Sequence, residues 1–299
     1  MSWIKQLPKE VPLLSGTTSC VGCGAVLSLR LALRILGERT IIVIPASCSA
    51  VIQGGYPVTA FKVPVVNSAF ASGAAVASGV LAALKVRGIE GVNVVVWAGD
   101  GGTADIGLQA VSGAANRQEN MLYMCYDNEG YMNTGVQTSG TTPFGALTTN
   151  EPKGKRLFKK DMPMIMMSHD IPYIATVNIS YPQDFVAKLK KALTYSGFKY
   201  IHIYSPCPPG WRIPGDQTIK IGKLAVETGI WPLMEIENGR FRLTGPSAKI
   251  LEEGKRKPIE TYLEAQERYR KMTQDDIKSL ENWIEQLWKK YTILQRCTN

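Results

Sequence analysis

The sequence predicts an α/β protein with a parallel β-sheet flanked by helices. Short runs rich in β-branched residues end at Gly or Pro, as is typical of strands that are buried on both faces. Segments with helical spacing separate several of these runs, and this alternation of strand and helix is the pattern of a parallel sheet. With 299 residues, 45% of them hydrophobic, the chain can bury the core of one large domain or of two small ones.

The individual elements follow from local patterns. Apolar runs predict strands at residues 40–44, 92–97, 121–126, 173–178 and 200–204. Segments with helical spacing predict connecting helices at residues 104–117 and 182–196. Because strands and helices alternate, the loops after the strands are expected to gather at the carboxyl edge of one sheet.

A long apolar stretch at residues 63–86 is rich in Ala, Gly, Ser and Val. Small residues let a helix approach another backbone closely, so we expect a helix that is buried or lies at a subunit interface. A membrane span is disfavoured by the same composition. Residues 1–12 interleave charged and apolar side chains, which is unlike a signal peptide and predicts a cytoplasmic protein.

The composition changes near residue 215, which divides a predicted main domain (1–215) from a C-terminal extension (216–299). Within the extension, Asn238-Gly239 is a strong turn signal for a β-hairpin. The predicted hairpin and the two charged amphipathic helices that follow it cover residues 231–243, 258–271 and 274–294. We expect this extension to pack on the main domain or on a partner subunit.

Four of the six cysteines carry the first functional signal. Cys20 and Cys23 form a Cys-Val-Gly-Cys pair, Cys48 follows in Ser-Cys-Ser, and Cys207 lies in Ser-Pro-Cys-Pro-Pro. A [4Fe–4S] cluster needs one thiolate for each iron, and Gly and Pro around every one of these residues suit a backbone that bends around such a cluster. A structural zinc site and disulfides are the alternatives, although zinc ligands usually come as two close pairs. Cys125, in an apolar run, and Cys297, near the C-terminus, are expected to be inert.

The second signal is a pair of loops after predicted neighbouring strands. One reads Gly99-Asp100-Gly101-Gly102, and Asn128 follows the next strand along the chain. A carboxylate and an amide oxygen from two such loops can hold one Mg²⁺, which also binds a diphosphate. Gly101 would let the diphosphate approach the backbone at a helix N-terminus near Thr103. This pairing favours thiamine diphosphate over a dinucleotide, because no GxGxxG motif opens a helix in the chain.

The net charge of +9 does not by itself identify a partner. The basic residues form no aromatic-interleaved patch or nucleic-acid-binding motif, so we expect no nucleic-acid partner. An acidic protein or a polyphosphate ligand would account for the charge equally well. The densest cluster comprises Lys153, Lys155, Arg156, Lys159 and Lys160, and it is either a solvated loop or a site that guides phosphates or acidic ferredoxin.

Together these motifs resemble the β subunits of pyruvate:ferredoxin oxidoreductases, also called pyruvate synthases, within the 2-oxoacid:ferredoxin oxidoreductase family. The resemblance rests on Cys-Val-Gly-Cys-Gly (20–24), Gly-Asp-Gly-Gly-Thr-Ala-Asp-Ile-Gly (99–107), Tyr-Asp-Asn-Glu-Gly-Tyr-Met-Asn-Thr-Gly (126–135), Ser-Pro-Cys (205–207) and Leu-Ala-Val-Glu-Thr-Gly-Ile-Trp-Pro-Leu (224–233). Val21 stands where the family commonly has Pro, at a position that is not a ligand.

The resemblance implies the thiamine-diphosphate-binding fold and a set of site residues. It implies that the [4Fe–4S] cluster is bound by Cys20, Cys23, Cys48 and Cys207. It implies that Mg²⁺ is held by Asp100, Asn128 and the carbonyl of Gly130, and that Asn133 reaches the reacting end of thiamine diphosphate. The implied cofactor-binding residues are Cys48, Gly99, Asp100, Gly101, Gly102, Asn128, Gly130, Tyr131 and Asn133.

The implied reaction is the reversible oxidative decarboxylation of pyruvate with coenzyme A, which gives acetyl-CoA, CO₂ and reduced ferredoxin. Alpha, gamma and delta subunits are the implied partners, and the Glu that activates thiamine is expected on the alpha subunit rather than at Glu119 or Glu129. His202 lies in an apolar strand pattern and is expected to be a core residue. Relatives acting on 2-oxoisovalerate, 2-oxoglutarate, indolepyruvate or oxalate share both signals, and an iron–sulfur protein without thiamine is the non-enzyme alternative.

Overall fold

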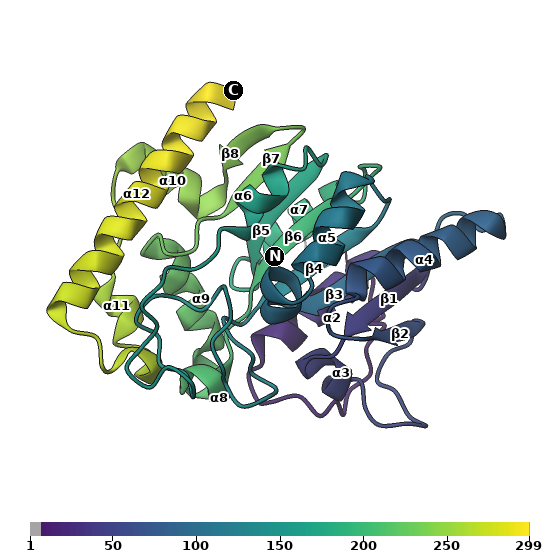
Figure 1. Cartoon of the computed structure of the whole chain (residues 1–299), viewed down its shortest axis with the longest axis horizontal. Coiled ribbons are helices and arrows are strands. Elements are labelled where there is room, and N and C mark those ends of the chain that lie inside the picture. Colours follow the sequence, from purple (N-terminus) through teal and green to yellow (C-terminus); the bar gives the residue numbers. More distant parts are fainter. Residues whose placement is uncertain (1–6, 299) are drawn as a thin grey trace.

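The computed structural model describes residues 7–298, so the first half of the charged segment 1–12 lies outside the described residues. Its centre is an eight-stranded sheet in the order β2-β1-β3-β4-β6-β5-β7-β8 (Figure 1). The strands are β1 (Thr40–Pro45), β2 (Val65–Ser68), β3 (Asn93–Gly99), β4 (Leu122–Asp127), β5 (Tyr173–Asn178), β6 (Lys199–Tyr204), β7 (Met234–Glu237) and β8 (Arg240–Leu243). Strands β1 to β6 run parallel, and the β7–β8 hairpin adds an antiparallel edge.

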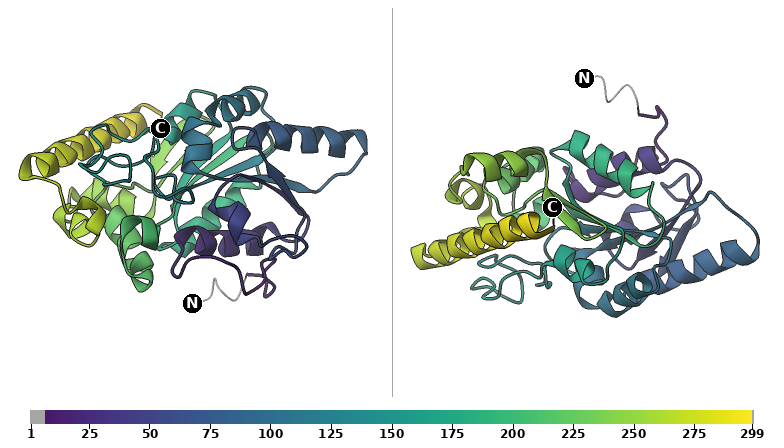
Figure 2. Two further views of the ribbon diagram at one scale, coloured as in Figure 1. Left: turned by 60° about the horizontal axis from the view of Figure 1, so that its bottom comes forward. Right: turned by 90° about the horizontal axis from the view of Figure 1, so that it is seen from above.

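Helices cover both faces of the sheet (Figure 2). One face is covered by α2 (Gly24–Leu36), α3 (Cys48–Ile52) and α7 (Pro182–Ala192). The other is covered by α4 (Gly73–Val86), α5 (Leu108–Asn116), α6 (Met162–Met167) and α12 (Gln274–Thr298). The remaining short elements are η1 (Gly101–Asp105), α8 (Pro208–Trp211), η2 (Gly215–Gln217), α9 (Thr218–Glu227), α10 (Gly245–Glu253), α11 (Glu260–Leu263) and η3 (Glu267–Tyr269).

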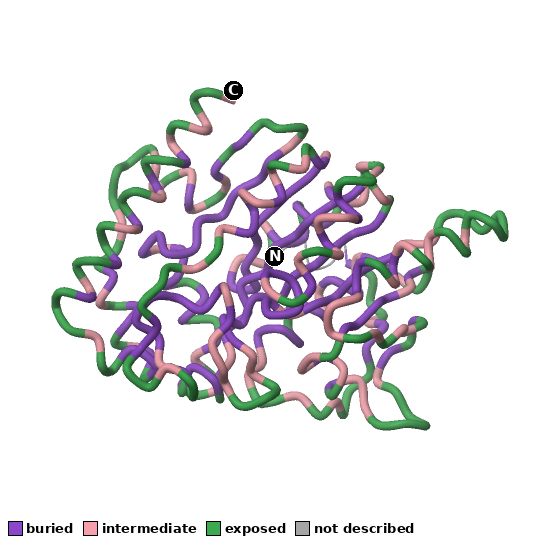
Figure 3. Tube along the Cα trace, viewed as in Figure 1, coloured by how far each residue is buried: buried purple, intermediate pink, exposed green. Residues whose placement is uncertain are grey.

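The central strands are apolar throughout because both of their faces are buried. In β3, Val94 and Val96 point into the core beneath α4 and α5, whereas Val95 and Trp97 point into the core beneath α2 and α3. The tube in Figure 3 shows these strands as a continuous buried interior. The prediction of a parallel α/β fold is therefore confirmed, and each of the five predicted strands is present within two residues of its expected ends.

The C-terminal hairpin forms at its predicted turn and extends the sheet. Asn238 and Gly239 both have positive φ, of 48° and 80°, as a two-residue turn of this kind requires. Strand β7 then pairs antiparallel with β5. Side chains of α12, including Leu280 and Ile284, join the same core cluster as the central strands. The segment after residue 215 thus packs on the sheet of the preceding segment.

The prediction of a helix over residues 258–271 is wrong. This segment forms only a single turn at α11 and a 3-10 turn at η3, separated by Gln266 in an extended conformation (φ −141°). The break turns Arg268 and Tyr269 into the interior, where both are buried. Contacts made by these two side chains outweigh the helix propensity of the segment.

The apolar stretch at residues 63–86, predicted as a buried or interface helix, forms strand β2 in its first part and helix α4 in its second. Within the first half of α4, Gly73, Ala74 and Ala77 are buried, and Gly73 is required because a Cβ atom there would lie 2.6 Å from Pro45 Cγ. The second half of α4 projects from the body of the molecule and ends at exposed Val86 (Figures 1 and 3). Among the described residues, no helix combines the length and apolarity needed to cross a bilayer.

Candidate active site

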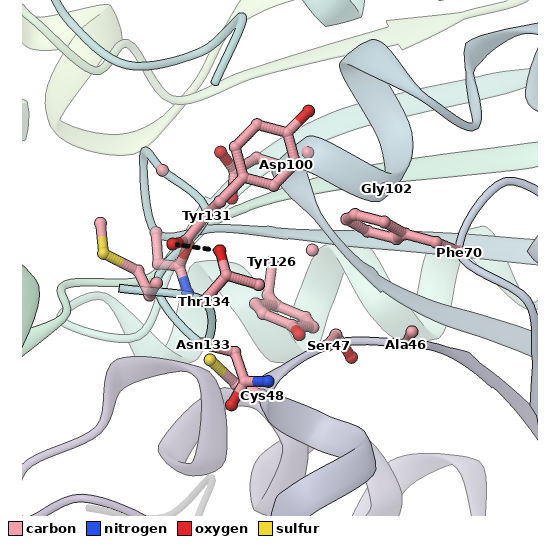
Figure 4. Close-up of a pocket in the computed structure, with 15 residues that line it drawn as sticks. Ala46, Ser47, Cys48, Phe70, Asp100, Gly102, Tyr126, Tyr131, Asn133 and Thr134 are labelled. Atoms are coloured by element: carbon pink, nitrogen blue, oxygen red, sulfur yellow. Dashed lines mark hydrogen bonds between the residues drawn. The ribbon is translucent and has the colours of Figure 1, made fainter. Parts of the chain in front are cut away.

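The loops that follow β1, β3 and β4 meet at the carboxyl edge of the sheet and line an open cleft (Figure 4). We call it the carboxyl-edge cleft; its walls are Ala46, Ser47, Cys48, Phe70, Gly99, Asp100, Gly101, Gly102, Tyr126, Asn128, Gly130, Tyr131, Met132, Asn133 and Thr134. Every residue expected to bind thiamine diphosphate is in this set. Open parallel sheets bind ligands at this edge.

The Asn128 side-chain amide lies close to two acceptors of the cleft, 2.9 Å from Asp100 Oδ1 and 3.0 Å from the Gly130 carbonyl oxygen. With its nitrogen on this side, the amide donates to both acceptors. With the amide turned the other way, its oxygen would face them, and the three groups would offer Mg²⁺ the oxygen ligands that it prefers. The three residues predicted as Mg²⁺ ligands are therefore near one another and of a suitable type.

Asp100 is well suited to a divalent cation. Burial, and then the nearby carboxylate of Asp127, raises the pKa of Asp100 to about 8. Its Oδ2 accepts hydrogen bonds from Ser139 Oγ at 2.6 Å and Thr141 Oγ1 at 2.9 Å, which leaves Oδ1 directed at Asn128. A bound cation would supply the counter-charge that this buried carboxylate otherwise lacks.

Glycine is required beside Asp100. A Cβ atom on Gly101 would lie 2.3 Å from Cε1 of Tyr131, so no other residue fits there without moving that ring. Tyr131 is held in place because its hydroxyl donates to Asp105 Oδ2 at 3.0 Å. Gly101 begins the π-helical turn η1, where Ile106 N donates to the Gly101 carbonyl. The turn thus brings its backbone to the wall of the cleft, as expected for a diphosphate site.

The four cysteines predicted to bind a cluster line a second pocket. This thiol pocket is lined by Cys20, Cys23, Cys48 and Cys207, together with Pro206, Pro208 and Pro209. Cys48 and Cys207 each have a pKa raised to about 12, first by burial and then by neighbouring groups that include the other cysteines of the pocket. Cys125 is fully buried in β4 and does not line this pocket.

The donors around these thiols also suit a cluster. Against the larger effect of burial, the backbone of Val26 and Ala25 lowers the pKa of Cys23, and that of Gly210 lowers the pKa of Cys207. Backbone N–H groups stabilise negative charge on the sulfurs of a cluster. Within residues 7–298, no three His, Cys, Asp or Glu side chains converge as ligands of a single ion do, and all six cysteines are free thiols. A four-iron cluster takes one thiolate for each iron and does not need that convergence.

The two pockets adjoin each other. Cys48, Asn128 and Asn133 line both the carboxyl-edge cleft and the thiol pocket. Figure 4 shows the Asn133 and Cys48 side chains next to each other at the lower end of the cleft. A ligand bound in the cleft would therefore lie beside the four thiols, with Asn133 at the boundary.

The motif-based predictions missed a buried charge network beneath the cleft. Asp127 accepts from Lys159 Nζ at 3.2 Å and pairs with His202 Nε2 at 2.9 Å. Burial alone would raise the pKa of Asp127, but Lys159 and His202 together hold it below its usual value. The sequence feature that could have indicated this network is Asp127 itself, an acidic residue at the end of an apolar strand. A carboxylate buried at such a position needs a charged or hydrogen-bonding partner.

The same network extends into the C-terminal segment. Glu129 pairs with Lys159 at 2.9 Å and with Arg268 at 2.7 Å, and both Glu129 and Arg268 are buried. The Arg268 guanidinium lies 3.7 Å from the centroid of the Trp211 ring, whose Nε1 donates to the Asn128 carbonyl at 2.8 Å. Trp211 follows Cys207 in α8, so it joins the cysteine loop to the loop of Asn128.

Two of the five basic residues at 153–160, Lys155 and Lys159, do not have the solvated side chains that the sequence suggested. Lys155 Nζ is buried and donates to three carbonyl oxygens, and Lys159 is paired with Asp127 and Glu129. Arg156 pairs with Asp276 and Lys160 with Asp105. The ammonium groups of Lys155 and Lys159 are bonded to carbonyls and carboxylates inside the protein. These two side chains are therefore not free to guide a charged partner.

Neither glutamate considered for thiamine activation lines the carboxyl-edge cleft. Glu129 is engaged by Lys159 and Arg268, and Glu119 pairs with Arg117 on the surface. Asp100 is the one carboxylate among the residues that line the cleft. His202 is buried between Asp127 and Tyr200, which is the core position expected for it.

Residues 50–203 match the thiamine pyrophosphate enzyme family, in its C-terminal TPP-binding domain. The chain is 48% identical over 293 residues to the pyruvate synthase subunit PorB of Methanothermobacter thermautotrophicus, covering 96% of this chain and all of that protein. It is also 48% identical over 294 residues to the ketoisovalerate oxidoreductase subunit VorB of Pyrococcus abyssi, covering 95% of this chain and 93% of that protein.

A solved structure of 2-oxoglutarate:ferredoxin oxidoreductase from Magnetococcus marinus shares the fold, with a TM-score of 0.57 and 23% identity. The likeness covers 73% of this chain and 79% of that one. The two sequence relatives match almost the whole length of the chain. The chain therefore belongs to the 2-oxoacid:ferredoxin oxidoreductase family, as a β-type subunit that contains the thiamine pyrophosphate-binding domain.

Proposed function

We propose that this chain is the β subunit of a pyruvate:ferredoxin oxidoreductase, or pyruvate synthase. Together with alpha, gamma and delta subunits in the cytoplasm, it would catalyse the reversible oxidative decarboxylation of pyruvate with coenzyme A. The products would be acetyl-CoA and CO₂, and the two electrons released would reduce ferredoxin. The carboxyl-edge cleft would hold Mg²⁺ and thiamine diphosphate, and the thiol pocket would hold a [4Fe–4S] cluster.

The observation that carries the proposal is the shared wall of the two pockets. Thiamine supplies an electron sink for decarboxylation, and a cluster accepts electrons one at a time. Cys48, Asn128 and Asn133 belong to both pockets, so a group oxidised in the cleft would be adjacent to the four thiols. Electron transfer from the cofactor to the cluster requires that the protein hold the two close together.

Individual residues would perform distinct tasks. Asp100, Asn128 and the Gly130 carbonyl would hold Mg²⁺, and the backbone of η1 at Gly101 would face the diphosphate. Asn133, whose amide lies at the boundary of the pockets, would donate a hydrogen bond to the substrate end of the cofactor. The carboxylate that activates thiamine would come from the alpha subunit, so this chain without its partner subunits would not turn over pyruvate.

A second candidate function is the same chemistry on a larger 2-oxoacid. It is favoured by the VorB relatives, which are as similar to this chain as the PorB relatives are. Pyruvate is the substrate we propose, and 2-oxoisovalerate, 2-oxoglutarate, indolepyruvate and oxalate are its competitors. A panel of these acids, assayed with coenzyme A and a low-potential acceptor on the assembled complex, ranks them by kcat/KM. A higher value for any acid other than pyruvate would replace the proposed substrate.

The cofactor assignment has its own test in Asp100→Ala. Loss of the carboxylate removes a charged ligand from a hard cation, so the variant complex should lose bound thiamine diphosphate while its iron content stays unchanged. Asp216→Ala, at an exposed position, is the matched control and should retain thiamine. Unchanged thiamine content in Asp100→Ala would show that the Gly-Asp-Gly turn has a structural role alone.

A further inference from the structure

A loop of hydroxyl side chains lies between the two segments that carry the proposed magnesium ligands. We call Ser139, Gly140, Thr141 and Thr142 the hydroxyl loop; its Ser and Thr residues are buried. It comes from neither of the motifs that identify the site, and none of its residues lines the carboxyl-edge cleft. Its contacts nevertheless reach both ligand segments.

The contacts divide by segment. Ser139 Oγ and Thr141 Oγ1 hydrogen-bond to Asp100 Oδ2 at 2.6 and 2.9 Å. Thr141 Oγ1 also lies 2.8 Å from Asp127 Oδ1, at the end of the strand that leads to Asn128. Thr142 Oγ1 donates to the carbonyl of Glu129 at 2.8 Å, which orients the peptide just before Gly130. The loop therefore contacts Asp100 itself, and it contacts Asp127 and Glu129, which precede Asn128 and Gly130 in the chain.

Lys155 holds the hydroxyl loop in this conformation. Its Nζ donates to the carbonyls of Ser139, Gly140 and Thr142 at 3.0, 3.3 and 2.8 Å, which uses all three protons of the ammonium group. The side chain is 5% exposed. The backbone N–H of Gly140 also donates to Asp105 Oδ2 at 2.8 Å. The loop is therefore anchored through its carbonyls by Lys155 and through this N–H by Asp105.

We propose that the hydroxyl loop and Lys155 position Asp100 for magnesium. The hydroxyls of Ser139 and Thr141 occupy Oδ2 and thereby turn Oδ1 toward the Asn128 side-chain amide. Lys155 acts through the loop and contacts no proposed ligand. This inference deepens the proposed function and rests on it, because it assigns a role toward Mg²⁺ and thiamine diphosphate in the same site.

The physical reason is the freedom of an unrestrained carboxylate. Asp100 can rotate about its side-chain bonds, and without partners at Oδ2 it would spend part of its time with neither oxygen aligned for the metal. Groups that hydrogen-bond to metal ligands commonly account for a difference of about 10- to 100-fold in metal affinity. A purely structural loop would instead change the stability of the fold without a specific effect on magnesium.

The test compares hydroxyl-deleting and hydroxyl-retaining variants of the assembled complex. Thr141→Val keeps the shape of the side chain and removes the hydroxyl, whereas Thr141→Ser keeps the hydroxyl. Thr138→Val is the matched control, because the Thr138 hydroxyl bonds to Thr148 and touches no proposed ligand. After removal of the cofactors by dialysis, thiamine diphosphate binding is followed by tryptophan fluorescence as a function of Mg²⁺ concentration. Iron content and melting temperature are measured on every sample.

We expect Thr141→Val to need about 10- to 100-fold more Mg²⁺ for half-maximal thiamine diphosphate binding. Thr141→Ser and Thr138→Val should stay within about twofold of the wild type, with iron content unchanged in all three. Ser139→Ala should repeat the effect of Thr141→Val, which covers the case in which the valine variant does not fold. Lys155→Met should do so with a smaller change, because its effect is indirect.

Several outcomes would overturn the inference. Thr141→Val and Ser139→Ala requiring the same Mg²⁺ concentration as the wild type would show that the hydroxyls do not position the ligand. Equal impairment in Thr141→Ser and Thr141→Val, with a matching fall in melting temperature, would assign the loop to stability alone. A wild-type complex that binds no thiamine diphosphate at any Mg²⁺ concentration would instead refute the proposed function, and the inference with it.

Discussion

Replacement of Arg268 by methionine tests whether the C-terminal segment is part of the site. Arg268 is 3% exposed, and its Nη2 lies 2.7 Å from Glu129 Oε2 and 3.0 Å from the Tyr262 hydroxyl. Its guanidinium also stacks on Trp211. Methionine keeps most of the apolar contact with that ring and removes the charge. The variant therefore leaves Glu129 with Lys159 as its one cationic partner.

The expected loss of unfolding free energy is about 3–4 kcal/mol. Removing one member of a buried ion pair typically costs about 3–5 kcal/mol, because the other charge remains desolvated. The cation–π contact with Trp211 contributes about 2 kcal/mol when it is shielded from water. The remaining bond between Lys159 and Glu129, at 2.9 Å, keeps part of the charge compensated and places the expected loss near the lower end of that range.

The assay is urea unfolding of the purified protein, followed by tryptophan fluorescence. Arg270→Met is the matched control, because Arg270 is about half exposed and its 3.7 Å pair with Glu267 is on the surface. That control should change the unfolding free energy by less than about 0.5 kcal/mol. In a Glu129→Gln background, Arg268→Met should cost about 2 kcal/mol less than in the wild type, since the ion pair is already absent.

Two results would refute this reasoning. An unfolding free energy of Arg268→Met within about 0.5 kcal/mol of the wild type would mean that the buried pair contributes nothing. An equal cost of Arg268→Met with and without Glu129 would mean that the effect comes from packing on Trp211 rather than from charge.

Further outcomes are expected at the thiols and at one buried lysine. Cys207→Ser should lose the four-iron electron paramagnetic resonance signal of the reduced protein, or convert it to a three-iron form, with thiamine still bound; Cys125→Ser should retain the signal, and the reverse pattern would exchange their roles. Burial lowers the pKa of Lys199 to about 8, so between pH 8 and about 10.5 the folded protein binds fewer protons than the unfolded chain and becomes more stable as the pH rises. Lys199→Met should therefore raise the unfolding free energy by about 1–3 kcal/mol at about pH 7 and by clearly less at about pH 9.5; an equal gain at both values would contradict the shifted pKa.

Local patterns in the sequence were sufficient to predict the parallel α/β core of the fold. The strands ending at Gly99 and Asp127 are apolar on both faces, which is a property of the segments themselves, and Asn238-Gly239 specifies its hairpin turn within two residues. The residues that line the carboxyl-edge cleft and the thiol pocket were also predictable from local motifs. Because neighbouring parallel strands end at one edge of a sheet, the positions of Asp100 and Asn128 along the chain are enough to predict that they lie near each other.

Contacts between residues far apart in the sequence were not predictable in this way. The segment 258–271 has the charged amphipathic pattern of a helix, yet Gln266 is extended because Arg268 reaches Glu129, 139 residues away. The basic residues of the loop at 153–160 look solvated in sequence, whereas Lys155 and Lys159 are buried among carbonyls and carboxylates. In both cases a partner from another part of the chain decides the outcome.

The sequence by itself determined the alternation of strands and helices, the edge of the sheet at which the predicted site residues gather, and the donor types available there. Each of these depends on neighbours within a few residues, through backbone preference and hydrophobic periodicity. The tertiary structure alone decided that Asp100 Oδ2 accepts from Thr141 and that Lys155 bonds to the carbonyls of the hydroxyl loop. It alone placed Arg268 against Glu129. Those features depend on desolvated polar groups finding partners across the fold, because a buried donor or acceptor without one is costly wherever it occurs in the sequence.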